Sequence, residues 1–281
     1  MRVSFCGVRG STPAPGPEFV RYGGHTSCVA LSHDGDEHRP TLLLDGGTGL
    51  RRLPDFLGDR PFRGTMLLTH LHWDHVQGLP FFPSGDHEGS RVTLLLPGED
   101  EHTDAEALLA RMMSPPFFPI GPHQLRGDWR FGLVPSGTFE AEGFTVVAMD
   151  VPHKGGRTVG FRVSAGRSSV AYVPDHCPTA LGDGPQGVGV YHEAVLELAR
   201  DVDLLIHDSH LRAEEVAEEA FFGHAAAEYA VGLGNLAGAR RVALFHHRPE
   251  RTDTEVDRTV RRFAESPVSV TGAAEGTTLA L

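Results

Sequence analysis

The 281-residue chain has few cysteines, no long apolar run and a shortage of positive charge. Its three cysteines, Cys6, Cys28 and Cys177, are an odd number with no Cys-x-x-Cys spacing, so neither a disulfide framework nor a cysteine zinc site is predicted. No apolar stretch approaches the roughly 18 residues of a membrane span. The N-terminal segment is interrupted by glycine and Arg9 too soon for a signal peptide. We therefore expect a soluble, cytoplasmic protein with no membrane partner.

Positive charge is scarce because 37 acidic residues face only 25 lysines and arginines, which gives a formal net charge of -12. Proteins that hold long nucleic acids neutralise the phosphate backbone with clustered basic residues. We therefore expect a small-molecule substrate and no long nucleic acid as a partner. With 40% hydrophobic residues, the chain can also bury a large core. We expect a single domain over 1–281. The sequence does not decide between a monomer and a homodimer.

Histidine, in contrast, is concentrated in one short segment, His70-Leu71-His72-Trp73-Asp74-His75. Neutral imidazole and carboxylate are both zinc ligands, and the spacing lets His70 and His72 face one ion while Asp74 and His75 reach a second. The apolar run 65–68 just before the segment predicts a short buried strand. The cluster should therefore lie at the carboxyl end of a strand, where α/β proteins place their chemistry.

The pattern His-x-His-x-Asp-His resembles the hallmark of the metallo-β-lactamase superfamily. The later ligands of that family have counterparts in the expected order, each after a β-rich run, at His153, Asp175 and His246. His246 fits the family pattern better than His247, because Pro249 follows three residues later.

The resemblance implies two divalent metal ions and a bridging carboxylate. One ion would be held by His70, His72 and His153, the other by Asp74, His75 and His246, with Asp175 between them. Zinc is the expected metal, with manganese as the alternative that imidazole and carboxylate also accept. The resemblance also implies an αββα sandwich, in which two mixed sheets lie face to face with helices outside. Asp45 should then support the metal loop rather than bind a metal.

The residue patterns predict the elements of such a fold. Strands are expected at 3–5, 27–32, 41–44, 65–68, 92–96, 144–151, 158–163, 168–173, 203–207 and 241–245, and helices at 105–113, 191–200, 211–220, 224–235 and 253–264. The last helix should start with a capping box of Thr252 and Glu255. Segment 114–120 is either a packed crossover or a lid whose Phe117 or Phe118 lines the substrate entrance.

Three further segments resemble the ribonuclease Z and phosphoribosyl cyclic phosphodiesterase branch of the superfamily. Residues 153–161 fit its pattern His-x4-Thr-x-Gly-aromatic. Asp208, after a strand, and His224, after Gly223, resemble the acid and the histidine that assist departure of the leaving group in that branch. The segments 7–13 and 23–28 resemble bacterial relatives of the cyclic phosphodiesterases, with His25 where asparagine is expected, so position 25 has no assigned role.

Two divalent ions about 3.5–4 Å apart can share a hydroxide and clamp the attacking and leaving oxygens of an in-line displacement, as phosphodiester hydrolysis requires. His224, paired with Asp208, would protonate the departing alkoxide, a step worth about 100- to 10,000-fold. With Asp74, these are the expected catalytic residues. We therefore expect a dinuclear metal-dependent hydrolase of small cyclic phosphodiesters, of the cyclic nucleotide or phosphoribosyl cyclic phosphate type.

Alternatives stay open. Ribonuclease Z carries a long arm between the third histidine and the bridging aspartate, whereas His153 and Asp175 are only 22 positions apart, so processing of tRNA 3′ ends is less expected. A lactone, thioester or β-lactam hydrolase would use the same metals without a leaving-group acid at His224. A metal-binding regulator would more often have lost ligands. The neighbouring histidines 176, 207, 210 and 247 are expected in supporting or surface roles.

Overall fold

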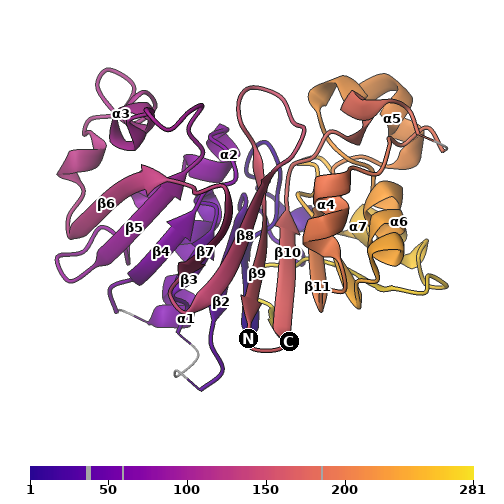
Figure 1. Ribbon diagram of the computed structural model, residues 1–281, viewed down its shortest axis with the longest axis horizontal. Coiled ribbons are helices and arrows are strands. Elements are labelled where there is room, and N and C mark those ends of the chain that lie inside the picture. The colour runs from indigo at the N-terminus through magenta and orange to yellow at the C-terminus, as the bar shows by residue number, and fades with distance from the viewer. Residues whose placement is uncertain (36–38, 59, 185) are drawn as a thin grey trace.

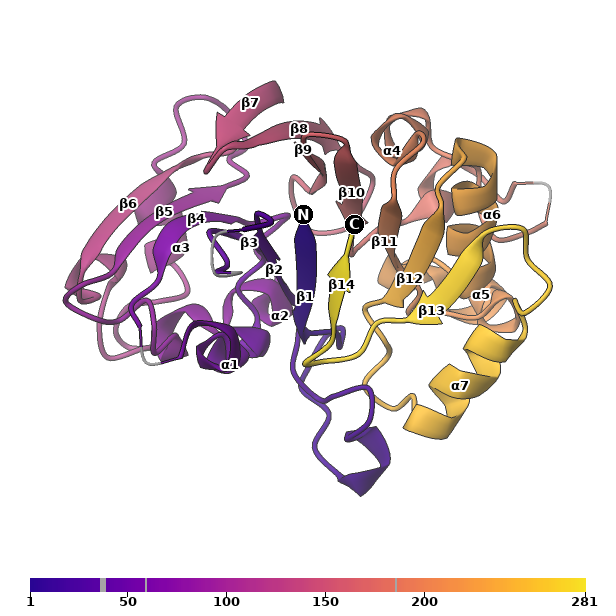
Figure 2. The ribbon, with the colours of Figure 1, turned by 90° about the horizontal axis from the view of Figure 1, so that it is seen from below.

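Two seven-stranded sheets pack face to face, with helices on their outer sides, in the computed structural model, which describes residues 1–35, 39–58, 60–184 and 186–281 (Figures 1 and 2). This arrangement is the expected αββα sandwich, so the predicted fold class is confirmed. None of the helices among these residues has the length and hydropathy needed to traverse a bilayer.

The first sheet contains β1 (Arg2–Gly7), β2 (Cys28–Ser32), β3 (Leu42–Leu44), β4 (Arg63–Leu67), β5 (Arg91–Leu96), β6 (Asp128–Leu133) and β14 (Thr278–Ala280). They lie in the order β14-β1-β2-β3-β4-β5-β6, and β3 to β6 run parallel while β1 pairs antiparallel with β2 and β14. The three residues of β3 are leucines and all are buried. Such continuous burial is typical of a strand covered on both faces.

The second sheet contains β7 (Gly137–Ala141), β8 (Phe144–Asp150), β9 (Val159–Ala165), β10 (Ser168–Val173), β11 (Leu204–Asp208), β12 (Arg241–Phe245) and β13 (Ser269–Gly272). They follow the order β13-β12-β11-β10-β9-β8-β7, and β10 to β13 run parallel. The carboxyl ends of these parallel strands therefore reach one edge of the sheet, where the chain continues into Asp175, Asp208 and His246.

Aromatic side chains fill the layer between the sheets. The rings of Phe5 on β1 and Phe245 on β12 lie with centroids 6.3 Å apart, and Tyr172 on β10 packs against Phe245 at 5.6 Å. All three side chains are buried, and full burial of such a side chain contributes about 1.5–3 kcal/mol. This layer fixes the two sheets relative to each other, so that loops at their ends can meet.

The helices are α1 (Pro54–Leu57), α2 (Trp73–Val76), α3 (Ala105–Ala110), α4 (Glu193–Ala199), α5 (Ala213–Glu219), α6 (Ala227–Ala237) and α7 (Asp253–Arg261). The first three lie outside the first sheet and the other four outside the second (Figure 2). The predicted capping box is confirmed at α7, where Glu255 accepts from the Thr252 N–H at 2.9 Å and the Thr252 hydroxyl accepts from the Glu255 N–H at 3.4 Å.

The strands that the sequence patterns did not predict are β6, β7, β13 and β14, and they are the four edge strands of the two sheets. An edge strand is covered less completely than a central one, and the side chains of β13 and β14 are all half-buried or exposed. Their apolar alternation is therefore weak. The predicted helix 224–235 also begins later, at Ala227, because residues 225–226 pair with Leu211 in an extended conformation.

Candidate functional site

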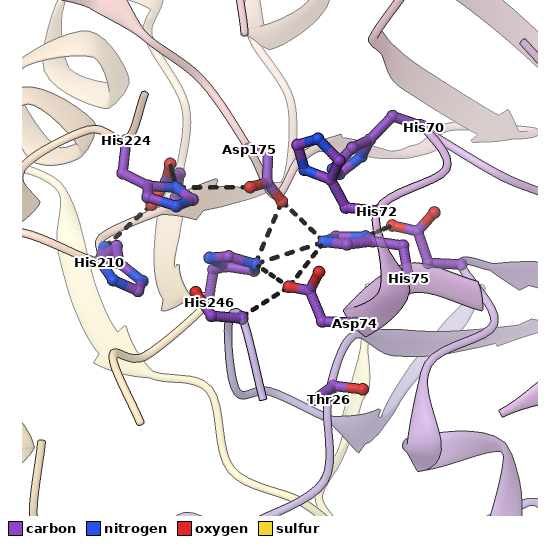
Figure 3. Close-up of polar contacts among 12 residues, drawn as sticks. Thr26, His70, His72, Asp74, His75, Asp175, His210, His224 and His246 are labelled. Atoms are coloured by element: carbon purple, nitrogen blue, oxygen red, sulfur yellow. Dashed lines mark hydrogen bonds and ion pairs between the residues drawn. The ribbon is translucent and has the colours of Figure 1, made fainter. Parts of the chain in front are cut away.

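The seven predicted metal ligands come together at the end of both sheets, in the space between them, and all of them except His153 are labelled in Figure 3. The histidine-rich segment follows β4 and turns into the short helix α2, while His153, Asp175 and His246 follow β8, β10 and β12. Within α2, Asp74 and His75 are buried, whereas Trp73 between the ligands is 75% exposed. The helical turn thus separates the ligands from a side chain that faces solvent.

The first group is His70, His72 and His153, and one ring nitrogen of each lies within 4.8 Å of those of the other two. Nε2 of His153 is 3.3 Å from Nδ1 of His72, and the other nitrogen of His153 donates to the Gly223 carbonyl at 2.8 Å. Nε2 of His70 is buried and has no hydrogen-bond partner in the described part of the chain. Burial lowers the pKa of each ring, which favours the neutral form that binds metals. Three such nitrogens around one space fit a metal ion.

The second group is Asp74, His75 and His246. Oδ2 of Asp74 lies 3.0 Å from Nε2 of His246 and 3.4 Å from Nε2 of His75. Burial would lower the pKa of His75, but the carboxylates around it raise that pKa well above its ordinary value. The surroundings of His75 therefore favour a positive charge, which a divalent cation in this group would also supply.

Asp175 lies between the two groups. Its Oδ2 is 2.8 Å from Nε2 of His75 and 3.2 Å from Nε2 of His246, while its Oδ1 is 3.5 Å from Nε2 of His153. Burial would raise the pKa of this carboxyl, but the histidines around it hold the pKa well below its ordinary value. One oxygen of an ionised carboxylate thus faces each group, which is the placement a bridging ligand needs.

Asp45 is in contact with the metal loop from behind. This fully buried carboxylate accepts hydrogen bonds from Nδ1 of His75 at 2.8 Å, from the backbone and hydroxyl of Thr69, and from the Tyr172 hydroxyl at 2.8 Å. The bond from Nδ1 leaves Nε2 of His75 to face the second group. Because Tyr172 belongs to the second sheet, the carboxylate also ties the loop to that sheet.

Asp208 and His224 form a buried pair beside Asp175. The carboxylate of Asp208 accepts hydrogen bonds from the backbone N–H groups of His176, His210 and Ala225, at 3.1, 2.9 and 3.1 Å. It is also 3.1 Å from Nδ1 of His224. Nδ1 of His224 is also 3.4 Å from Oδ1 of Asp175. Burial would lower the pKa of His224, but Asp208 and the neighbouring carboxylates raise it to about 9. Bound cations would lower that pKa by repulsion.

His210 is closer to the centre than the sequence suggested. Its ring stacks on His224 with centroids 4.2 Å apart and planes at 19°, and it is only 6% exposed. One nitrogen each of His210, His224 and His246 lie within 4.8 Å of one another. Neither ring nitrogen of His210 has a hydrogen-bond partner among the residues the structure describes. In the sequence, only its position two residues after Asp208 indicated that His210 could lie near the centre. Its contact with His224 depends on tertiary stacking.

The other neighbouring histidines lie outside the centre. His176 and His207 are buried together, with Nδ1 of the first 3.2 Å from Nε2 of the second. His247 donates from Nε2 to the Ala273 carbonyl at 2.9 Å, and burial lowers its pKa to about 3. His246, not His247, therefore reaches the ligand groups. Nδ1 of His25 contacts the Thr48 hydroxyl at 3.3 Å.

Segment 114–120 does not cover the centre. Phe117 is 84% exposed, and the ring of Phe118 packs edge-on against Phe81 at 5.7 Å. Neither ring lines the cavity next to His70, which is bounded instead by Leu71, α3 and residues 155–157. The arrangement favours the packed crossover over the lid.

A family model described as the Beta-lactamase superfamily domain matches residues 41–247. A ribonuclease Z of Methanothermobacter thermautotrophicus is 27% identical, over 91% of this chain and 89% of that protein. Among solved structures, the metallo-beta-lactamase fold protein YhfI from Bacillus subtilis superposes with a TM-score of 0.72 at 17% identity, covering 99% of both chains. A diphosphatase from the PhnP family gives a TM-score of 0.70 at 18% identity, covering 100% of this chain and 97% of that one.

Proposed function

The chain belongs to the β-lactamase superfamily and is a metal-dependent hydrolase, and we propose that it cleaves small phosphodiesters, cyclic ones in particular, at a centre of two divalent ions. Zinc is the metal we propose, with manganese as the alternative. In this proposal residues 1–281 act as a single domain, since both sheets contribute ligands. Relatives named ribonuclease Z and diphosphatase support a substrate with a phosphorus–oxygen bond to break.

The observation that carries the proposal is the pair of Asp208 and His224 beside the candidate bridging residue Asp175. Hydrolysis of an alkyl phosphodiester releases an alkoxide, which needs a proton as its bond to phosphorus breaks. Nδ1 of His224 is engaged by Asp208, so Nε2, for which no partner is found among the described residues, is free to give that proton.

When bound, the two ions would supply Lewis-acid activation of water and of the phosphoryl oxygens. The first group, the second group and Asp175 would hold them. Asp45 orients His75 and the Gly223 carbonyl orients His153, so that each ring presents one fixed nitrogen. The Ser11 N–H donates to Oδ2 of Asp74 at 2.6 Å, which restrains that carboxylate from the N-terminal loop. The three backbone N–H groups that donate to Asp208 hold its carboxylate in place beside His224.

A substrate panel on protein of defined metal content tests the proposal. It comprises bis-p-nitrophenyl phosphate, 2′,3′- and 3′,5′-cyclic nucleotides, a phosphoribosyl cyclic phosphate, a lactone, a thioester and a β-lactam. We expect turnover of the phosphodiesters. Turnover of the lactone, thioester or β-lactam with inert phosphodiesters would overturn the proposal in favour of that alternative.

Processing of tRNA 3′ ends is a second candidate, because the similarity to ribonuclease Z covers most of both chains. Two observations weigh against it. The interval from His153 to Asp175 is occupied by β9 and β10 and leaves no room for an arm, and the net charge is -12. Cleavage of a precursor tRNA at rates above those on cyclic nucleotides would make RNA the substrate.

A further inference from the structure

A cavity of about 340 Å³ adjoins the metal centre and is bounded on one side by His70. Its apolar wall is formed by Leu71, which follows that ligand, and by Leu108, Leu109 and Met112 in and after α3. We call this space the retained-group cavity. Its volume lies at the lower end of the range of about 300–1,000 Å³ that is usual for small-molecule sites.

The cavity lies across the centre from the leaving-group histidine. Figure 3 shows His224 and His210 on one side of Asp175, and His70 and His72 on the other. In an acyclic phosphodiester whose leaving oxygen meets His224, the other substituent lies on a different side of phosphorus from that oxygen. That substituent points toward the side on which the cavity opens.

The floor of the cavity is bare backbone at Gly155 and Gly156, whose φ angles are 81° and 133°. A Cβ on Gly155 would come within 2.7 Å of Nε2 of His72, so this backbone approaches the ligand closely. A Cβ on Gly156 would meet nothing within 4 Å. The second glycine therefore leaves open a space that a side chain would partly occupy.

The charge of the lining indicates what kind of group fits. Nε of Arg157 donates to Oδ1 of Asp150 at 2.8 Å, so the charge of Arg157 is balanced by a partner. Glu99 and Arg111, which are exposed at the rim, have opposite charges. The cavity is thus close to neutral, and a further phosphate group would find little compensating charge there.

We propose that the retained-group cavity binds the substituent that stays esterified to phosphorus, and that this substituent is an uncharged ring of aryl or nucleobase size. The inference rests on the proposed phosphodiesterase function and defines its substrate class. In the reaction, a water oxygen loses one proton to solvent and forms a bond to phosphorus, the bond from phosphorus to the leaving oxygen breaks, and His224 gives that oxygen a proton and regains one from solvent. The ester bond to the ring in the cavity is not broken.

The test uses three p-nitrophenyl phosphodiesters that share one leaving group and differ in the retained group: methyl, phenyl and thymidine-5′-yl. We expect kcat/KM of the zinc-loaded protein to be about tenfold higher or more for the two ring esters than for the methyl ester, as is usual when an apolar group enters a pocket. Met112→Trp should fill the cavity and bring that ratio close to one. Leu236→Trp, at a 61% exposed position on α6, is the matched control and should keep the ratio.

Met112→Ala is a second variant that keeps the test decisive if Met112→Trp does not fold. Its smaller side chain enlarges the cavity, so it should increase the preference for a naphthyl ester over the phenyl ester. Each comparison is a ratio within one protein, so the folded fraction cancels. A parent that cleaves all three esters equally, or a ring preference that survives Met112→Trp, would overturn the inference.

Calorimetric binding of phenyl phosphate and methyl phosphate separates this inference from the proposed function. We expect phenyl phosphate to bind more tightly to the parent and equally to Met112→Trp. If no phosphodiester is cleaved but this binding preference holds, the proposed function fails while the cavity assignment stands. If the diesters are cleaved but neither rates nor binding distinguish the rings, the cavity assignment fails alone.

Discussion

Nδ1 of His224 lies 3.1 Å from Oδ2 of Asp208, a carboxylate that three backbone N–H groups hold in place. This contact fixes which nitrogen of the imidazole faces away from Asp208. It gives a buried histidine one defined direction in which to donate a proton. The contribution of that proton can be measured by changing the leaving group.

We expect His224→Ala to lose activity in proportion to how poor the leaving group is. Departure of an alkoxide without a proton should cost about 3–5 kcal/mol in the transition state, whereas p-nitrophenolate departs without help. Rates on a cyclic nucleotide and on a p-nitrophenyl diester, with metal content as the control, check this. Equal losses on both substrates would place His224 in phosphate binding or structure instead.

The position of Asp175 between the two ligand groups predicts the metal content of the protein. Because each oxygen of Asp175 faces a different ligand group, the reconstituted protein should hold close to two zinc or manganese ions per chain, and Asp175→Ala should hold fewer. Elemental analysis after gel filtration measures both. A parent that never exceeds one ion, with an Asp175→Ala variant that binds as much, contradicts a dinuclear centre.

Asp45→Ala should weaken metal binding without removing a ligand. The substitution frees Nδ1 of His75 and leaves the Tyr172 hydroxyl buried without its acceptor. Loss of such an orienting carboxylate typically lowers metal affinity about 10- to 100-fold. Tyr172→Phe is the matched control, since it removes one hydrogen bond to the same carboxylate but leaves His75 oriented. Competition with a chelator gives the affinities, and similar values for the two variants would contradict an orienting role.

His210→Phe keeps the shape of the ring that stacks on His224 but removes both nitrogens. Because Nδ1 is buried without a protein partner and Nε2 also has none among the described residues, we expect the ring to contact the substrate, and the variant should lose about tenfold or more in kcat/KM with its metal content unchanged. Unchanged kinetics would show that only the stacking matters.

Glu275 should make stability depend on pH away from the centre. Burial raises the pKa of this carboxyl to about 7, although the His25 N–H and Arg52 favour the ionised form. A carboxyl whose pKa is higher in the folded than in the unfolded chain binds more protons when folded, so its contribution is complete below pH about 4.3 and is lost as the pH rises to about 7. Glu275→Gln should remove that slope. Urea unfolding of both proteins between pH 5 and 8 gives the difference, and parallel curves would contradict it.

The sequence was most informative where side chains are buried on both sides. Central strands such as β3 and β10 consist almost wholly of buried residues, and their apolar runs marked both the strands and the ligands that follow them. Edge strands such as β13 and β14 lack that signal because one side of each has no neighbouring strand. The resemblance pointed to Asp208 and His224 as a pair. The stacking of His210 depends on how β11 and the segment before α6 meet, which no local pattern encodes.

Strand β14 pairs with β1, so Ala280 lies opposite Arg2 although almost the whole described chain separates them (Figure 2). While the protein is being synthesised, the backbone N–H and C=O groups of β1 on its β14 side therefore have no strand partner until β14 has left the ribosome. An open strand edge of this kind is where nascent chains pair with the wrong partner. Yield in the cell should consequently depend on how quickly residues 278–280 reach β1, and substitutions there would alter the amount of protein recovered more than the rate of each molecule.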